Sequence, residues 1–126
     1  MIEDANILFK KAENDLINAK VLFESDKTTG DGICFHCQQA GEKYLKAYLA
    51  YNNKEIIKTH DISNILEDCK QIDTDFAKMS EIKADKLTYY AVNTRYDDIT
   101  EPTSDDAKEP IYIAEQVKSF VIGKIK

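Results

Sequence analysis

The sequence predicts an all-α protein, a single domain in which four to five helices pack as an antiparallel up-and-down bundle. Apolar residues recur at helical spacing in most segments, whereas stretches that alternate with period two are short. Four glycines and two prolines interrupt the chain only sparsely. A length of 126 residues, 43% of them hydrophobic, suits one domain with one core that covers residues 1–126.

The first helix is expected from Glu3 to Glu24, and glycine-rich turn chemistry is expected to break the chain over Ser25 to Gly32. The second helix then runs from Ile33 to Tyr51 and ends at Asn52-Asn53, because asparagine tolerates the left-handed conformation found after helices. The apolar stripes that support these two helices are Ala5, Leu8, Phe9, Ala12, Leu16, Ala19 and Phe23 in the first, and Ile33, Cys37, Ala40, Gly41, Tyr44, Leu45 and Tyr48 in the second.

A shorter third helix is expected from Asp61 to Gln71, with Thr59 or Asp61 as its N-cap. A separate turn over Asp75 to Met79 precedes the fourth helix, which is expected from Ser80 to Thr94. The predicted inward-facing residues are Ile62, Ile65, Leu66 and Cys69 in the third helix, and Leu87, Tyr90, Ala91 and Thr94 in the fourth.

The last helix is expected to follow a loop over Asp97 to Pro102 and to reach Lys124. Pro110 lacks a backbone donor, so a helix that starts near Thr103 or Ser104 kinks there; alternatively it begins near Glu109 with the proline in its first turn. We favour a kinked or two-piece helix. Its predicted inward face consists of Ile113, Ala114, Val117, Phe120 and Val121.

The formal charge of −6 argues against an extended nucleic-acid surface, which needs a basic stripe. We also expect no membrane segment, because no apolar stretch approaches the roughly 18 to 20 residues of a spanning helix. The acidic start, Met1-Ile2-Glu3-Asp4, does not resemble a signal peptide. We therefore expect a cytoplasmic microbial protein.

The pair Cys34 and Cys37 has redox spacing at a helix start, where a thiolate is favoured. Redox pairs of this spacing follow a β-strand, and none is predicted before Cys34. A zinc site would need Cys34, Cys37, His36 and Cys69 together, and neighbouring residues of a helix point in different directions. We therefore favour the interpretation that these cysteines are small core residues. We expect no metal and no cofactor. His60 beside Asp61 suggests acid–base chemistry, but helix capping explains the pair more simply.

Two polar groups are candidates for ligand binding. His36, Gln39 and Lys43 share one face of the second helix, where Lys43 could contact a phosphate and His36 or Gln39 a base or sugar. A solvated or dimer-facing stripe is the simpler interpretation of that spacing. Arg95 with Tyr96 and Asp97 suits either phosphate binding and stacking or a structural ion pair.

The stretch from Cys34 to Ala47 (CFHCQQAGEKYLKA) resembles the second-helix signature of HEPN domains, an aromatic-His-x-x-Gln-x-x-Glu-Lys-x-Leu-Lys pattern. The resemblance continues in order along nearly the whole chain. Its other parts are Asp15-Leu16 with Ala19, THDI at Thr59 to Ile62, LTYY at Leu87 to Tyr90, Thr94-Arg95-Tyr96, and the segment from Ala114 to Val121.

The resemblance implies an up-and-down bundle, a homodimer, and partnership with a minimal nucleotidyltransferase, in some members as a toxin–antitoxin pair. Many HEPN proteins are metal-independent ribonucleases in which an arginine is followed four to six residues later by a histidine. Here Arg95 is the only arginine, and His36 and His60 both precede it. The resemblance is therefore to members without that motif, for which nucleotide binding has been proposed, and we expect no catalytic residue. The alternative is a dimeric HEPN ribonuclease with an atypical site.

Overall fold

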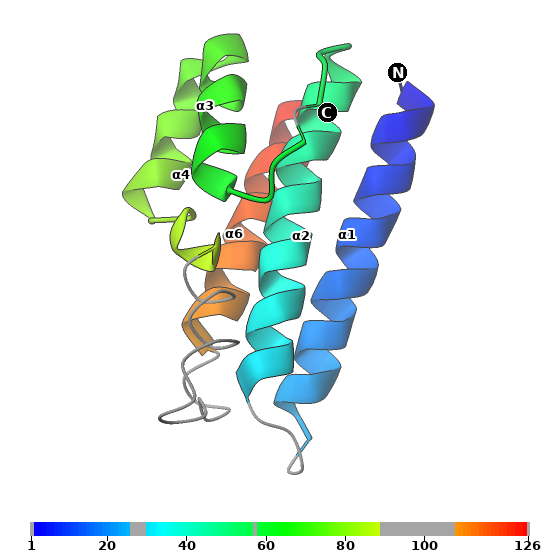
Figure 1. The fold of residues 1–126 in the computed structure, drawn as a ribbon, viewed down its shortest axis with the longest axis vertical. Helices are drawn as coiled ribbons and strands as arrows, with labels where there is room; N and C mark the ends of the chain where they lie inside the picture. Colours follow the sequence, from blue (N-terminus) through cyan, green and yellow to red (C-terminus); the bar gives the residue numbers. More distant parts are fainter. Residues whose placement is uncertain (1, 26–29, 57, 89–107, 126) are drawn as a thin grey trace.

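A computed structural model describes residues 2–25, 30–56, 58–88 and 108–125, and this part of the chain is helical with no strand. The long helices are α1 (Ile2–Phe23), α2 (Gly30–Tyr51) and α6 (Lys108–Ile125). Figure 1 shows them side by side along the long axis of the molecule, while α3 (Ile62–Ile72) and α4 (Ala77–Glu81) flank α2 on the side away from α1. The predicted all-α bundle is confirmed.

The central helix is α2, which packs against α1, α3 and α6. Almost every residue from Ile33 to Ala50 is buried or half-buried, as expected for a helix that is surrounded on most sides. All seven residues that the sequence places on its inner side are buried. Any polar residue on α2 therefore lies in or beside a seam between helices, and its position there needs a partner.

The start of α2 corrects one sequence expectation. The helix begins at Gly30, so Gly30 and Gly32 are helical and not part of a turn that extends to Gly32. A Cβ atom on Gly32 would lie 3.2 Å from the Cδ1 atom of Leu22 in α1. The missing side chain of Gly32 therefore lets α1 pack closely on the first turn of α2, a role that does not depend on a turn.

The end of α2 agrees with the prediction. The helix ends at Tyr51, and Asn53 has a left-handed backbone with φ of 56°. The amide of Lys54 donates to the Leu49 carbonyl at 2.9 Å and that of Asn53 to the Ala50 carbonyl at 3.0 Å. This is the Schellman arrangement that closes many helices.

The third helix begins where the sequence predicts. Asp61 is its N-cap, and its side chain accepts a hydrogen bond from the Ser63 amide at 2.9 Å. All four predicted inner residues of α3 are buried. In Figure 1 the chain returns from the upper end of α2 before α3 starts, so that α2 and α3 run in the same direction and end at the same end of the molecule.

The fourth helix differs from the prediction of one helix from Ser80. A 3-10 turn, η1 (Thr74–Phe76), leads into the short α4, which ends at Glu81. Lys83 adopts a left-handed backbone with φ of 61°, and the Ala84 amide bonds the Met79 carbonyl at 2.9 Å, which closes α4. Helical structure resumes at residues 86–88, where Leu87 is buried. The predicted Tyr90, Ala91 and Thr94 lie outside the described residues.

The last helix, α6, is described from Lys108 onward and includes Pro110 within its helical run. The residues before it, with the expected loop over 97–102 and the start near Thr103 or Ser104, lie outside the described residues, so both alternatives for its start stay predictions. Of the predicted inner residues of α6, all but the half-buried Phe120 are buried.

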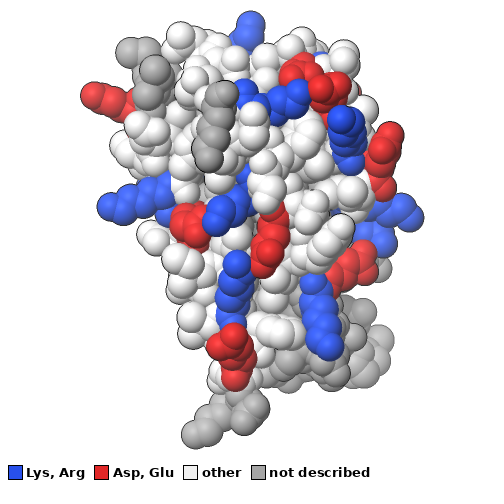
Figure 2. Space-filling view, turned by 180° about the vertical axis from the view of Figure 1, so that it is seen from behind, with Lys and Arg blue, Asp and Glu red and all other residues white. Residues whose placement is uncertain are grey.

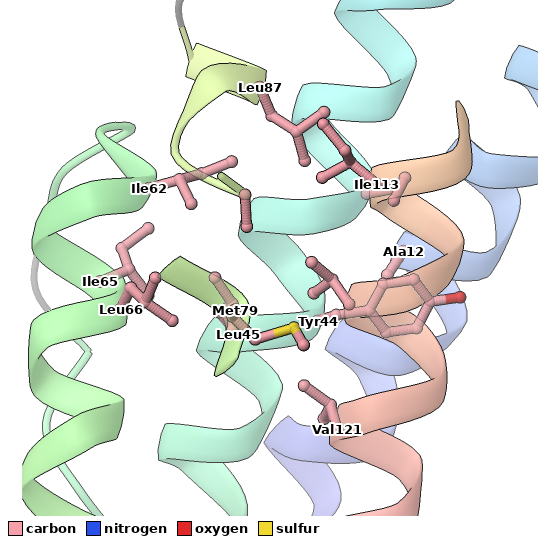
Figure 3. Packing of buried hydrophobic residues seen from close by; sticks show 14 of the residues in the cluster. Ala12, Tyr44, Leu45, Ile62, Ile65, Leu66, Met79, Leu87, Ile113 and Val121 are labelled. Carbon is pink, nitrogen blue, oxygen red and sulfur yellow. The ribbon is translucent and has the colours of Figure 1, made fainter. Parts of the chain in front are cut away.

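One apolar cluster joins all of these elements (Figure 3). Tyr44 of α2 lies within it beside α1 and α6, and its hydroxyl reaches out of the core to donate to Glu13 of α1 at 2.7 Å. The centroid of the Phe76 ring lies 4.5 Å from that of Tyr48 in a tilted contact and 4.9 Å from that of Phe120 in an edge-on contact. The core therefore fixes the rotation of α2, and with it the positions of the polar residues along its seams.

Candidate functional site on helix α2

A carboxylate on α1 holds two of the predicted site residues. Asp15 is buried, and one of its oxygens lies 3.0 Å from Nδ1 of His36 while the other accepts from the Lys43 ammonium. His36 and Lys43 lie two helical turns apart on α2, on the side that faces α1. A single acid thus orients an imidazole and an ammonium group across the α1–α2 seam.

The contact with Asp15 orients the His36 ring. A carboxylate oxygen can only accept, so Nδ1 carries a proton and Nε2 is the ring nitrogen left for another partner. The side chains of His36 and Lys43 are 25% and 24% exposed. Both are therefore held at the edge of the seam, where a ligand can still reach them, and neither is a core residue.

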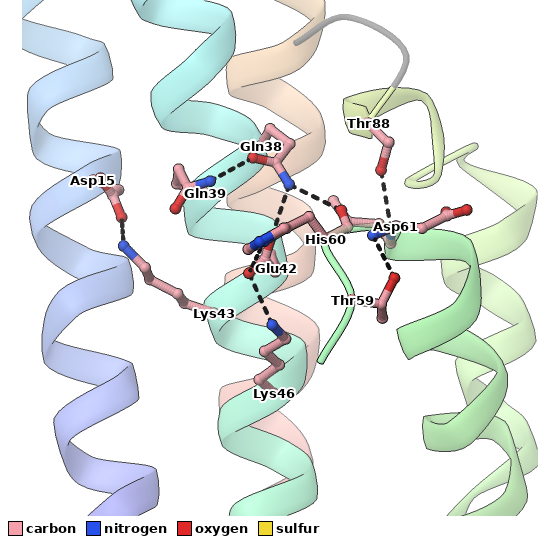
Figure 4. Close-up of polar contacts among 11 residues, drawn as sticks. Asp15, Gln38, Gln39, Glu42, Lys43, Lys46, Thr59, His60, Asp61 and Thr88 are labelled. Carbon is pink, nitrogen blue, oxygen red and sulfur yellow. Dashed lines mark hydrogen bonds and ion pairs between the residues drawn. The ribbon is translucent and has the colours of Figure 1, made fainter. Parts of the chain in front are cut away.

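Gln39, the third predicted residue, is bonded along α2 and not to α1. Its amide nitrogen donates to Oε1 of Gln38 at 2.8 Å. Gln38 is buried, and its own nitrogen donates to Oε1 of Glu42 at 2.9 Å and to the His60 carbonyl at 3.1 Å. Gln38 consequently links Gln39 to a second polar cluster on the other side of α2 (Figure 4).

The second cluster surrounds Glu42, whose side chain is only 5% exposed. Its carboxylate accepts hydrogen bonds from the Lys46 ammonium at 3.0 Å and from the Gln38 amide at 2.9 Å. Nδ1 of His60 lies 3.0 and 3.2 Å from its two oxygens. Several donors compensate for the burial of this charge. The His60 side chain is 83% exposed, so the carboxylate is anchored from inside and the imidazole covers it from outside.

Together these residues form two hydrogen-bonded groups on α2, one that reaches α1 and one that reaches the segment before α3, and we name them the α2 polar band (Figure 4). It consists of Asp15, His36, Gln38, Gln39, Glu42, Lys43, Lys46 and His60.

Sequence reasoning found three members of the band as ligand candidates and missed the cluster around Glu42. The sequence did contain one indication of this cluster: Glu42 and Lys46 are four residues apart, a spacing that favours an ion pair on a helix. Arg95, Tyr96 and Asp97, the other predicted site residues, lie outside the described residues.

The cysteines occupy the core. Cys34, Cys37 and Cys69 are buried, and burial raises the pKa of the Cys37 thiol and raises that of Cys69 to about 12. A raised pKa disfavours the thiolate that redox and metal chemistry require. The geometry supports the packing interpretation of the Cys34–Cys37 pair.

The comparison with protein families decides the relationship that the sequence suggested. The model of the HEPN domain matches residues 5–125. The chain belongs to the HEPN domain family.

Among solved structures, this HEPN chain is similar to ST0689, described as an archaeal HEPN homologue. The TM-score is 0.71 at 26% identity, and the match covers 97% of this chain and 98% of the other. A search of curated proteins gives no significant match. Across the described residues of this HEPN domain, no helix combines the length and the apolar character needed to span a bilayer.

The surface of the HEPN domain carries mixed charge. Figure 2 shows the face opposite to that of Figure 1, where blue and red side chains alternate among the described residues. Among the described residues, charged pairs between helices include Lys20 with Glu115 at 3.0 Å and Lys118 with Glu13 at 2.7 Å. On this face the described residues show interspersed charges of both signs and no single basic field.

Proposed function

We propose that this HEPN domain is a nucleotide-linked accessory module that binds through the α1-facing part of the α2 polar band. In this proposal the module is a cytoplasmic homodimer and pairs with a minimal nucleotidyltransferase in a toxin–antitoxin-like system. His36, Gln39 and Lys43 contact the ligand or partner, and Arg95, Tyr96 and Asp97 complete the surface.

The single observation that carries the proposal is the shared Asp15 carboxylate. It holds the His36 ring and the Lys43 ammonium in fixed positions while both remain about a quarter exposed. Orientation of donors before binding reduces the entropy lost when a ligand arrives. Lys43 retains further hydrogens for a phosphate oxygen, and Nε2 of His36 faces away from its carboxylate.

The sequence favours binding over RNA cleavage. Arg95 has no histidine after it in the chain, so the arginine–histidine ribonuclease motif is absent. A module with an intact helical core and a polar band but without that motif is better suited to binding than to general RNA hydrolysis.

A direct test is titration of the ¹⁵N-labelled protein with ATP and with GTP. We expect saturable amide shifts along Gln39 and Lys43 and roughly tenfold weaker binding for Lys43→Ala, because one charge-assisted hydrogen bond is lost. Lys70→Ala is the matched control, since Lys70 pairs with the exposed Glu67 on α3, away from the α2 polar band. Absence of saturable shifts, or equal weakening by both variants, would contradict nucleotide binding at this site.

One observation favours a second candidate, a dimeric HEPN ribonuclease with an atypical site. The Asp15–His36 pair has the arrangement in which a carboxylate orients an imidazole for proton transfer. This candidate predicts cleavage of single-stranded RNA that His36→Gln and Arg95→Ala both abolish while the fold is retained. Intact RNA after prolonged incubation with the dimer would exclude it.

A further inference from the structure

A pocket of about 430 Å³ lies between α2 and α3, apart from the α2 polar band. Its volume is within the range of sites that bind small organic molecules, about 300–1,000 Å³. Ile72, which is half-buried, supplies the accessible apolar surface of the pocket. The polar residues that line it are Lys54, Glu55, Asp68 and Gln71.

The rim of the pocket is rigidly held on its α2 side. The Schellman arrangement at the end of α2 fixes the backbone of Lys54 by its bond to the Leu49 carbonyl. Leu49 is itself 1% exposed and anchored in the core. Lys54 and the adjacent Glu55 are therefore presented from a fixed turn.

The four polar side chains have no hydrogen-bond or ion-pair partner within the part of the chain that the structure describes. Lys124 of α6, by contrast, contacts both Asp73 and Asp75. Asp68 is moreover only half-exposed. Polar groups gathered around an apolar floor and left without partners are suited to a ligand with both kinds of surface.

The electrostatics of the pocket favour a cation. Glu55 and Asp68 outnumber Lys54, and the helices α2 and α3 both end at this side of the molecule (Figure 1). The C-terminal end of a helix carries partial negative charge, which attracts cations over the last turn. The two carboxylates and the two helix ends therefore all attract a positively charged ligand.

We infer that this pocket binds a small organic cation, a primary ammonium or guanidinium group attached to an apolar body. The cationic group pairs with Asp68 and Glu55, and the apolar body covers Ile72. Lys54 and Gln71 remain available for an oxygen substituent on the same ligand. This site is independent of the proposed nucleotide function.

The experiment is an NMR titration of the ¹⁵N-labelled full chain with phenethylamine and, separately, with hydrocinnamate, which carries a carboxylate on a similar body. We expect phenethylamine to shift the amides of Leu49, Lys54, Asp68 and Ile72 with an affinity of about 1 mM, and hydrocinnamate to leave them unchanged.

Variants localise the effect. Asp68→Asn should weaken phenethylamine binding about fivefold, as expected for the loss of one partly exposed ion pair. Glu67→Gln removes a charge from the adjacent position of α3, where Glu67 pairs with Lys70, and should leave binding unchanged. Equal responses to the two probes, shifts confined to other residues, or equal effects of the two variants would each overturn the inference.

Discussion

Nδ1 of His60 lies 3.0 Å from one carboxylate oxygen of Glu42 and 3.2 Å from the other. These two residues belong to separate stretches of the HEPN resemblance, the second-helix signature and the Thr-His-Asp-Ile segment before α3. Their contact fastens the start of α3 to the middle of α2. Part of the HEPN pattern therefore has a structural use, distinct from the His36 and Lys43 side that we propose for binding.

Glu42→Gln should destabilise the fold by about 2 kcal/mol, because it removes a buried charge that several donors share. The amide of the new glutamine would also place its own N–H groups against the groups that donate to Glu42. Urea unfolding at neutral pH measures the difference in free energy. Glu67→Gln, at a side chain that is 64% exposed, should change it by less than about 0.5 kcal/mol. An equal loss in both variants would show that the Glu42 cluster does not stabilise the bundle.

Two glycines should respond to alanine in opposite directions. A Cβ atom on Gly41 would lie 2.6 Å from Cδ1 of Leu87, which is fully buried and cannot move freely. Gly41→Ala should therefore cost about 1–3 kcal/mol by overpacking. A Cβ atom on Gly123 meets nothing within 4 Å, so Gly123→Ala on α6 should stabilise by up to about 1 kcal/mol. Thermal and urea unfolding would measure both, and stabilisation by Gly41→Ala would contradict the packing of α2 against Leu87.

The Glu13 carboxylate should make stability depend on acid pH. Hydrogen bonds from Lys118 and then Tyr44 lower the pKa of Glu13 from its ordinary 4.5, against a smaller effect of burial. Because the folded-state pKa is depressed, this stabilisation is complete above the unfolded-state pKa and is lost as the pH falls through the folded-state pKa.

The test compares wild type with Glu13→Gln in urea at several pH values. Wild type should be more stable above about pH 5, and the difference should shrink as the pH falls below the ordinary pKa of a glutamate. A difference that grows towards acid pH would contradict the contacts of Glu13 with Lys118 and Tyr44.

The cysteines should be unreactive in the folded protein. The pKa of Cys69 is raised to about 12 and that of Cys37 is raised as well, both chiefly by burial, and Cys34 is also buried. Ellman's reagent should react slowly with native protein and rapidly with three thiols in urea. Rapid reaction of one thiol in the native protein would contradict this prediction and would support redox chemistry at the start of α2.

Most of the fold follows from periodicity. The first helix was predicted from Glu3 to Glu24 and observed as Ile2–Phe23, and the four predicted inner residues of α3 are all buried. Helix ends that depend on contacts were harder to predict. Gly32 has the composition of a turn, but the close approach of Leu22 makes it a helical packing position.

The site could be predicted only in part, because its partners come from distant parts of the chain. His36 and Lys43 share a face of one helix by simple spacing, but Asp15 lies 21 and 28 residues away from them. Single-sequence periodicity shows which residues share a face and not which helix that face meets. For the same reason His60 suggested only local capping, whereas its ring contacts Glu42, 18 residues away.

The central claim is that the α1-facing part of the polar band serves a binding module. The most direct measurement is co-purification at native expression, with mass spectrometry to identify and quantify any minimal nucleotidyltransferase retained by wild type, Lys43→Ala and Lys70→Ala. We predict a stoichiometric complex that survives Lys70→Ala and is lost with Lys43→Ala while the helical content is unchanged. A homodimer that does not co-purify with a transferase, or a complex that is unaffected by Lys43→Ala, would contradict the claim.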